Sequence, residues 1–527
     1  MSDENMLEVG QRVTRSATTS GVSSAVSGGC GCPSLRWWWM RSQPSKVCWK
    51  RLGACDVQRP RLIGIVTPFP AWAPCPRLRM PRLSPPWRED IVNVKRPHVN
   101  DPRTSRRWRG AKSPWCGSGA ACTMPSFEDG EGATVRTMDD ISKRVESLRD
   151  VAIGIRRELH RYPETAYEET RTAACIAKQL RELGMEVHEG IGVTGVLGVL
   201  KGARPGKTVL LRAQMDALAM QAEPEGRPWR SVLADRNHAC GHDFNMALVL
   251  GAAHVLATWR ERFAGQVAFV FQPAEEPQTG AMRMIRDGLF ERVKPDFVIA
   301  QHAMDNLPPG KVVAQAGPIW ASVDVLKLTI HGERTELDVP HGGADAMLMA
   351  AEAITSLYAM AHREHPLQEP VLLRVTSIAG RSGPGQPTAE IGIRLSTYNR
   401  AVQEAMVRRI GEVASGVVAA MRGTCALENT HSLPPIVNHP VPAQALIDAA
   451  RETVGAENVV DNWRNTFPED FAWFMERAPG AVFGVGTNNP AKGTGRFHAP
   501  DYDVDDDAVP IGVEVTARAA LKLLRGV

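Results

Sequence analysis

Short apolar segments alternate with helical patterns over residues 195–300, and this alternation limits the possible folds more than any other feature of the sequence. A helix is expected over 246–259, which contains Leu248, Leu250 and Val255, and two more helices precede the apolar segments. Strands that alternate with helices usually form a largely parallel sheet, so the sequence predicts an α/β fold. The expected strands are 195–200, 208–212, 266–271 and 297–300, and the two earlier helices are 138–162 and 168–183.

Residues 321–432 show a different order of elements, with more strands for each helix. Their β-α-β-β-α-β-like order predicts a small α+β domain inserted into the first domain. We therefore expect the first domain to comprise residues 124–320 and 433–527, with the inserted domain at 321–432. Within the insertion, the expected strands are 323–330, 370–378 and 389–395, and the expected helices are 344–360 and 400–421.

Residues 1–123 differ in composition from the rest of the chain. They hold 20 of the 62 Lys and Arg residues but only 7 of the 58 Asp and Glu residues. Arginine interleaved with tryptophan could bind nucleic acid or an anionic membrane surface, but no recognition motif accompanies it. Because prolines interrupt any regular pattern, we expect a disordered extension, or residues upstream of a true start at Met124, and neither a nucleic-acid nor a membrane partner.

Two further features concern the compartment. No stretch of about 18 uninterrupted apolar residues is present, so we expect no membrane-spanning helix. The chain after residue 123 contains only Cys175, Cys240 and Cys425, too few for a disulfide scaffold. This cysteine usage fits a reducing compartment, and we expect a cytoplasmic protein.

Polar side chains follow several of the expected strands. Asp216 follows the strand at 208–212, and the pair Glu275-Glu276 follows the strand at 266–271. His302 and His498 follow two further apolar segments, 297–300 and 481–486. Open α/β sheets place their active sites beyond the carboxyl ends of the strands. Acids and imidazoles delivered to that edge by four strands are typical of a metal site.

The segment 238–243 gives the strongest local signal. Cys240 and His242, in a turn before a helix, can both point at one ion, and thiolate with imidazole suits zinc or another first-row transition metal. Adjacent carboxylates can divide the work, one as ligand and one as general base, which is a common arrangement in hydrolysis. Each motif alone could equally be a buried cysteine with a core histidine, or two exposed glutamates. Together the five nitrogen, sulfur and oxygen donors favour the metal site.

The order of these motifs resembles a family of metal-dependent amidohydrolases and peptidases. That family includes hippurate hydrolases, N-acyl-amino-acid amidohydrolases and plant auxin-conjugate hydrolases. The resemblance runs from about residue 138 to 525. The matching segments are LHRYPETAYEE at 159–169, GVTGVLGVLKG at 192–202, LLRAQMDALAMQAEP at 210–224, HACGHD at 238–243, QPAEE at 272–276, QHA at 301–303, FPEDFAWF at 467–474 and FHAPDYDV at 497–504.

The resemblance implies a dinuclear-metal α/β catalytic domain with an inserted lid or dimerisation domain, and a homodimer formed through the insertion. It implies that Glu275 is the general base and that Asp216 supports the metal site from behind. It also implies two divalent ions per chain, of zinc, manganese or cobalt, with a small amide as substrate. The implied metal ligands are Cys240, His242, Glu276, His302 and His498.

The chain departs from the family pattern where relatives handle the substrate. Glu336 stands where the lid of relatives carries a histidine that reaches the partner's site, although His341 matches. A glutamate there would repel a substrate carboxylate, so we expect weakened hydrolysis of ordinary acyl amino acids. Gln214 and Asn245 replace an aspartate and a histidine, and the lid segment 379–390 lacks a usual asparagine.

These observations leave two functions open. The leading hypothesis is a metal-dependent hydrolase of an amide bond in an N-acyl amino acid or a related small amide. The alternative is a metal-binding homologue with impaired catalysis that serves as a binding or regulatory protein. The retained ligands and the altered substrate-handling positions fit either a shifted substrate or a partly disabled enzyme.

Overall fold

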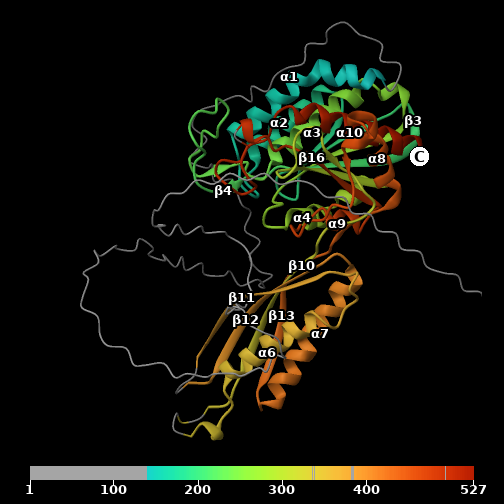
Figure 1. Cartoon of the computed structure of the whole chain (residues 1–527). Helices are drawn as coiled ribbons and strands as arrows, with labels where there is room; N and C mark the ends of the chain where they lie inside the picture. The colour runs from blue at the N-terminus through green and yellow to red at the C-terminus, as the bar shows by residue number, and fades with distance from the viewer. Residues whose placement is uncertain (1–138, 335, 337–338, 382–384, 493, 527) are drawn as a thin grey trace, which may run out of the picture. The chain divides into compact units, whose positions relative to one another are not determined.

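The computed structural model describes residues 139–334, 336, 339–381, 385–492 and 494–526 (Figure 1). The expected extension at 1–123 lies outside the described residues, so its disorder stays a prediction. In the described part of the chain, no helix is long and apolar enough to cross a membrane.

The larger sheet has eight strands in the order β1-β2-β6-β3-β7-β16-β8-β15. Its centre is parallel, because β6, β3, β7 and β16 run in one direction. Strands β1 and β2 pair antiparallel with their neighbours, and β8 pairs antiparallel with β16 but parallel with β15. The predicted α/β fold with a mostly parallel sheet is confirmed. The strands are β1 (Glu186–Ile191), β2 (Gly195–Lys201), β3 (Arg204–Gln214), β6 (Ala264–Gln272), β7 (Phe297–Met304), β8 (Val312–Val313), β15 (Val459–Val460) and β16 (Gly480–Gly486).

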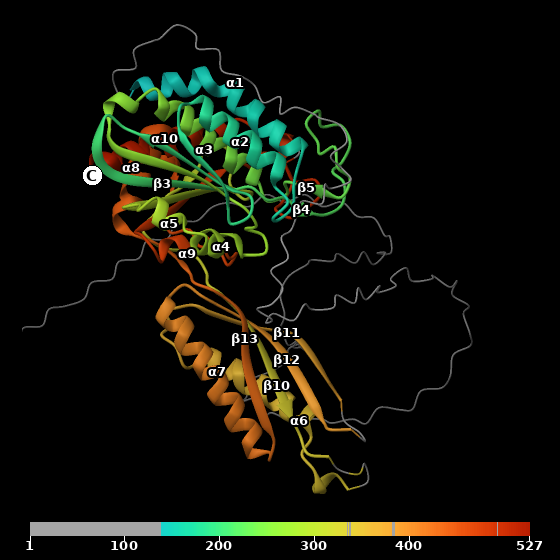
Figure 2. The ribbon, with the colours of Figure 1, turned by 180° about the vertical axis from the view of Figure 1, so that it is seen from behind.

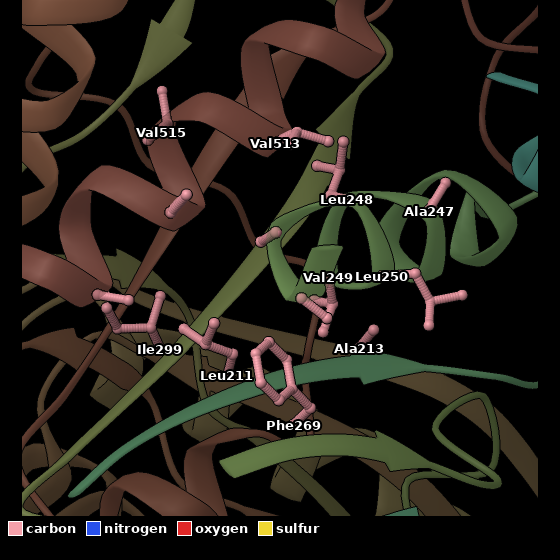
Figure 3. Close-up of a cluster of buried hydrophobic side chains, with 14 of the residues drawn as sticks. Leu211, Ala213, Ala247, Leu248, Val249, Leu250, Phe269, Ile299, Val513 and Val515 are labelled. Carbon is pink, nitrogen blue, oxygen red and sulfur yellow. The ribbon is translucent and has the colours of Figure 1, made fainter. Parts of the chain in front are cut away.

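Helices cover both faces of this sheet, and side chains alternate between them. Along β3, Leu211 and Ala213 face one hydrophobic cluster, whereas Leu210 faces the other. Figure 3 shows Leu211 and Phe269 of the sheet beneath helical side chains such as Leu248 and Val513. The first face is covered by α1 (Asp139–Arg161), α2 (Thr170–Glu182), α3 (His242–Ala257), α8 (Pro440–Val454) and α10 (Ala508–Arg525), and the second by α4 (Gly280–Arg286), α5 (Leu289–Arg292) and α9 (Ala472–Met475).

Helix α3 begins four residues earlier than the sequence predicts. The expected start was Met246, but the helix starts at His242, directly after Gly241. Gly241 has a φ of +78°, and a Cβ there would lie 2.8 Å from the Tyr502 hydroxyl. Glycine therefore permits a sharp turn between Cys240 and the helix, which places His242 in the first helical turn.

A separate four-stranded antiparallel sheet has the order β11-β12-β10-β13. Helices α6 and α7 lie along one face of this sheet, as both views show (Figures 1 and 2). The strands and helices occur in the predicted order. They are β10 (Val323–His331), α6 (Ala346–Ala361), β11 (Val371–Arg381), β12 (Thr388–Thr397), α7 (Arg400–Ala420) and β13 (Thr424–Leu433).

The chain enters and leaves this smaller sheet through two short strands that pair with each other. Strand β9 (Gly317–Trp320) precedes β10, and β14 (Ile436–Asn438) follows β13. They are antiparallel, with Trp320 opposite Ile436. The two connections therefore lie side by side, as expected for an inserted segment.

Candidate metal centre and active site

The carboxyl ends of the central strands bring the expected ligands together. The Sγ atom of Cys240 lies 3.9 Å from Nε2 of His302 and 3.4 Å from Nε2 of His498. His498 Nε2 is in turn 3.8 Å from Glu276 Oε2. Ligand atoms lie within 4.8 Å of one another in each of three sets: Cys240, His242 and His302; Cys240, Glu276 and His498; and His242, Glu275 and Glu276.

One ring nitrogen of His242 contacts Asp216, and the other is free to bind a metal ion. Its Nδ1 lies 2.8 Å from the backbone carbonyl oxygen of Asp216 and 3.5 Å from that residue's Oδ1. If Nδ1 carries the proton, Nε2 has a free lone pair. Nε2 of His242 and Oε1 of Glu276 are buried atoms without a hydrogen-bond partner among the described residues. Buried polar atoms are rarely left unsatisfied, so two such atoms in one cluster fit a cation.

The electrostatics of the cluster also fit a cation. Burial alone would lower the pKa of His242, but the hydrogen bond and charge of Asp216 and the charge of Glu276 raise it to about 9. Burial, reinforced by the charges of Glu276 and Glu275, raises the pKa of the Cys240 thiol well above its usual value. The site therefore concentrates negative potential, and a divalent ion would be needed to hold Cys240 as a thiolate.

Glu275 is buried beside this cluster, with Oε2 at 3.7 Å from Nε2 of His242. Burial raises its pKa well above the usual range, and the charges of Glu469, Asp470 and Glu276 add to the effect. A carboxylate with a raised pKa accepts a proton more readily than an ordinary glutamate. The arrangement suits a general base that works next to a metal ion.

Strained backbone surrounds the cluster. Ala274, Gln278 and His498 all have positive φ values, of 51°, 57° and 60°. Such conformations are costly for residues other than glycine and persist where the surrounding structure holds them. Gly280 closes the loop that carries Glu275 and Glu276, and a Cβ there would lie only 1.6 Å from the Pro273 carbonyl oxygen.

Sequence reasoning missed the buried network behind Glu275. Arg212 on β3 donates hydrogen bonds to both oxygens of Glu469, at 3.0 and 2.9 Å, and to Asp470 at 2.8 Å. Gln214 donates to Glu469 at 2.5 Å, and Asn245 donates to Gln214 at 3.1 Å. Two departures from the family pattern thus contact each other. An arginine inside an apolar strand was the one signal in the sequence that could have indicated this network.

A second buried network lies beneath the start of α3. Asp243 accepts one hydrogen bond from Arg156 at 3.0 Å and lies 2.9 Å from Nδ1 of His160, and both of these residues are on α1. The other ring nitrogen of His160 is 3.1 Å from Glu223. Burial would lower the pKa of His160, but Asp243 and Glu223 raise it to about 9. These contacts fix the helix that presents His242.

The cluster opens into a cavity of about 510 Å³. Its wall combines Glu275, Cys240 and other cluster residues with aromatic side chains and with residues of β11 and β12 from the smaller sheet. A hydrogen-bonding contact of 2.6 Å between His431 of β13 and Gln278 joins that sheet to the loop after Glu276. The aromatic lining residues are Trp320, Trp463, Phe467 and Phe497.

The structure does not bring every expected site residue into this cavity. Asp216 lies behind His242, as the sequence suggested for a supporting residue. Glu336 and His341 are exposed and are not among the residues that line the cavity in the described part of the chain. Their expected role toward a partner subunit stays a prediction.

Known proteins are similar to this chain in sequence and fold. Residues 210–522 match the family model described as peptidase family M20/M25/M40. Thermostable carboxypeptidase 1 of Saccharolobus solfataricus is 32% identical over 394 residues, which cover 73% of this chain and 98% of that protein. N-acetyl-L-cysteine deacetylase of Bacillus subtilis is 33% identical over 385 residues, covering 72% and 90%. A Bacillus subtilis structure, described as a dinuclear metal-binding peptidase of the M20 family, matches with a TM-score of 0.64 at 27% identity, over 72% of this chain and 100% of that one.

A parallel sheet that ends in clustered metal-ligand side chains beside a buried glutamate defines the class, a metal-dependent hydrolase. The matched segment is more than half of the chain, and relatives above 30% identity match more than two thirds of it. The chain therefore belongs to peptidase family M20/M25/M40. The resemblance predicted from the motifs is confirmed, and so is the hydrolase class.

Proposed function

We propose that this enzyme hydrolyses the amide bond of an N-acyl amino acid or a related small amide. The observation that carries the proposal is the convergence of ligand atoms beside Glu275 at one cavity. A volume of about 510 Å³ suits a small molecule. The relative named N-acetyl-L-cysteine deacetylase supports an acylated amino acid as the substrate class.

In this proposal, five side chains hold two divalent ions of zinc, manganese or cobalt, and Asp216 keeps His242 in the ligating tautomer. Such ions would polarise the substrate carbonyl and lower the pKa of a bound water. The donor set of one thiolate, three imidazoles and one carboxylate suits first-row transition metals better than magnesium or calcium. The proposed ligands are Cys240, His242, Glu276, His302 and His498.

Glu275 moves the proton in the proposed reaction. It accepts a proton from the attacking water while the water oxygen bonds to the amide carbon. The carbon–nitrogen bond then breaks, and Glu275 returns the proton to the leaving nitrogen, which departs as an amine while the acyl part becomes a carboxylic acid. The buried acids Glu469 and Asp470 support this role because their charges raise the pKa of Glu275.

The test combines metal analysis with turnover on N-acetyl, N-benzoyl and aminobenzoyl amino acids, measured as released amine. We expect about two metal ions per chain and turnover of at least one substrate. Cys240→Ala should lower metal content, whereas Cys425→Ala should not, since Cys425 lies on β13 away from the cluster. Two metal ions with no turnover on any substrate would favour the alternative, a metal-binding homologue with impaired catalysis.

The homodimer through the inserted segment and the cytoplasmic location remain predictions. Sedimentation of the full chain checks the first, because a dimer should have about twice the 57.5 kDa chain mass. Fractionation of the cells that make the protein checks the second.

A further inference from the structure

Two arginines of the smaller sheet face the cavity side by side. Arg374 on β11 and Arg394 on β12 are direct partners in the strand register. Both line the cavity that contains Glu275 and the ligand cluster. Residues directly opposite each other on antiparallel strands lie on the same face of a sheet, and like charges in that position are destabilising.

The alternation of the strands explains why both arginines point toward the cavity. Leu373, Ile393 and Leu395 are buried in the cluster beneath α6 and α7. Their neighbours Leu372, Arg374, Arg394 and Ser396 lie on the opposite face, and all four line the cavity. A one-residue shift in either strand would remove the pair from the cavity.

Neither arginine forms an ion pair or a side-chain hydrogen bond with another of the described residues. Lys327, on the same face of the sheet, does have such a partner, since it pairs with Glu390 at 2.9 Å. Burial lowers the pKa of Arg394, and the charge of Arg374 lowers it further. Two guanidinium groups without a counter-charge thus face a cavity that is large enough for a ligand.

An anionic ligand would remove this repulsion. Guanidinium groups bind carboxylates through paired, charge-assisted hydrogen bonds, and each arginine can bind one carboxylate. The other side of the cavity carries Glu275, Glu276 and Glu469, which would repel carboxylates that are not metal-bound. The anionic part of a substrate would therefore lie toward β11 and β12, with its amide toward the ligand cluster.

We infer that Arg374 and Arg394 form a dicarboxylate-binding subsite, so that the preferred substrates are small amides that carry two carboxylate groups. This inference rests on the proposed amide hydrolysis and specifies its substrate class. It differs from the expectation drawn from Glu336, which is exposed and lies outside the cavity lining. The charges that actually line the cavity near the smaller sheet are positive.

The test compares N-acetyl-L-glutamate with N-acetyl-L-glutamine, which have nearly the same shape but differ by one negative charge. We expect the full-length, metal-loaded enzyme to favour the glutamate compound in kcat/KM by about tenfold or more, the scale of one charge-assisted hydrogen bond. Arg374→Gln should abolish the preference and change the glutamine compound little, and Arg374→Lys should restore part of it. Lys327→Gln is the matched control and should leave both values unchanged.

N-succinyl-L-alanine extends the test, because its second carboxylate belongs to the acyl part. The wild type is compared on N-succinyl-L-alanine and N-acetyl-L-alanine. If it prefers the succinyl compound and Arg374→Gln removes that preference, the subsite binds a second carboxylate on the acyl part of the substrate and not on the amine part. Either preference supports the subsite. The subsite would be overturned if the wild type prefers neither dicarboxylate, or if Arg374→Gln lowers kcat/KM equally for all substrates.

A binding measurement distinguishes a failure of this inference from a failure of the proposed function. If no substrate turns over, the hydrolysis proposal fails, but calorimetry can still measure N-acetyl-L-glutamate binding to the full chain. Affinity that falls about tenfold in Arg374→Gln would support the subsite. Equal affinity in wild type and variant would reject it.

Discussion

The ligand cluster and the arginine face of the smaller sheet handle charge in opposite ways. At the cluster, buried acids, imidazoles and arginines come from segments far apart in the chain, and most of them form hydrogen bonds or ion pairs with one another. On the smaller sheet, Arg374 and Arg394 are placed side by side by strand register alone, and neither forms an ion pair with another of the described residues. The difference suggests that a buried network of hydrogen bonds and ion pairs fixes the residues that carry out the chemistry. Substrate choice would instead depend on two arginines that line the cavity and can be replaced without disturbing that network.

The largest expected effect concerns the chemical centre. Glu275→Gln keeps the shape of the side chain but removes the proton acceptor, so kcat should fall by about 10²- to 10⁴-fold with metal content nearly intact. Glu276→Gln should instead lower metal content. Metal analysis alongside steady-state kinetics checks both variants, and exchanged results would show that the two roles were assigned in the wrong order.

The next effect compares an interior arginine with a surface arginine. Arg212→Met would leave Glu469 and Asp470 buried without their counter-charge and should cost about 3–5 kcal/mol of unfolding free energy. Arg409→Met on α7 removes exposed pairs with Glu364 and Glu412 and should change the unfolding free energy far less. Denaturant unfolding of both variants measures the contrast. Equal losses in Arg212→Met and Arg409→Met would show that the buried ion pairs stabilise the fold no more than the exposed ones do.

Stability should also depend on pH through the network below α3. The pKa of His160 is raised from 6.5 to about 9 in the folded protein. Its charged form therefore stabilises the fold fully below about pH 6.5, and this contribution, about 3 kcal/mol, is lost as pH rises toward 9. Unfolding of wild type and His160→Gln between pH 6 and 9 checks this. The variant should show a flatter profile, and identical slopes would contradict the assignment.

The smallest effect concerns the support of a ligand. Asp216→Asn should weaken the orientation of His242 and lower metal affinity by about 10- to 100-fold. Asp324 of β10 is a matched control, since it is also buried and accepts hydrogen bonds from Gln403, Asn429 and Ser432. Metal titration of Asp324→Asn should match that of wild type, and a similar loss in both variants would indicate a general effect on folding.

The sequence predicted the central strands of the larger sheet and the order of elements in the smaller one, because apolar periodicity and helix breaks are local signals. It did not predict β1, β8 and β15 of the larger sheet. It also predicted which residues meet at the cluster, since parallel strands deliver their carboxyl ends to one edge. Their individual ligand roles remain predictions. The start of α3 was wrong by four residues because a left-handed glycine, not an apolar period, determines it.

Contacts across long sequence distances could not be predicted. The Arg212–Glu469 pair spans 257 residues, and nothing local relates the two positions. The arginine pair depends on the register between β11 and β12, which the sequence of either strand alone does not specify. The residues that form the cavity wall could therefore be identified only from the folded structure.

The hydrogen bond that Asn245 donates to Gln214 limits which single substitutions these two positions can accept. Gln214 also donates to Glu469, so an aspartate at position 214 would place two carboxylates in contact unless a neighbouring group carried a proton or positive charge. A histidine at position 245 could supply that charge. Positions 214 and 245 are thus physically coupled: Gln214→Asp alone or Asn245→His alone should destabilise the fold more than the two changes made together.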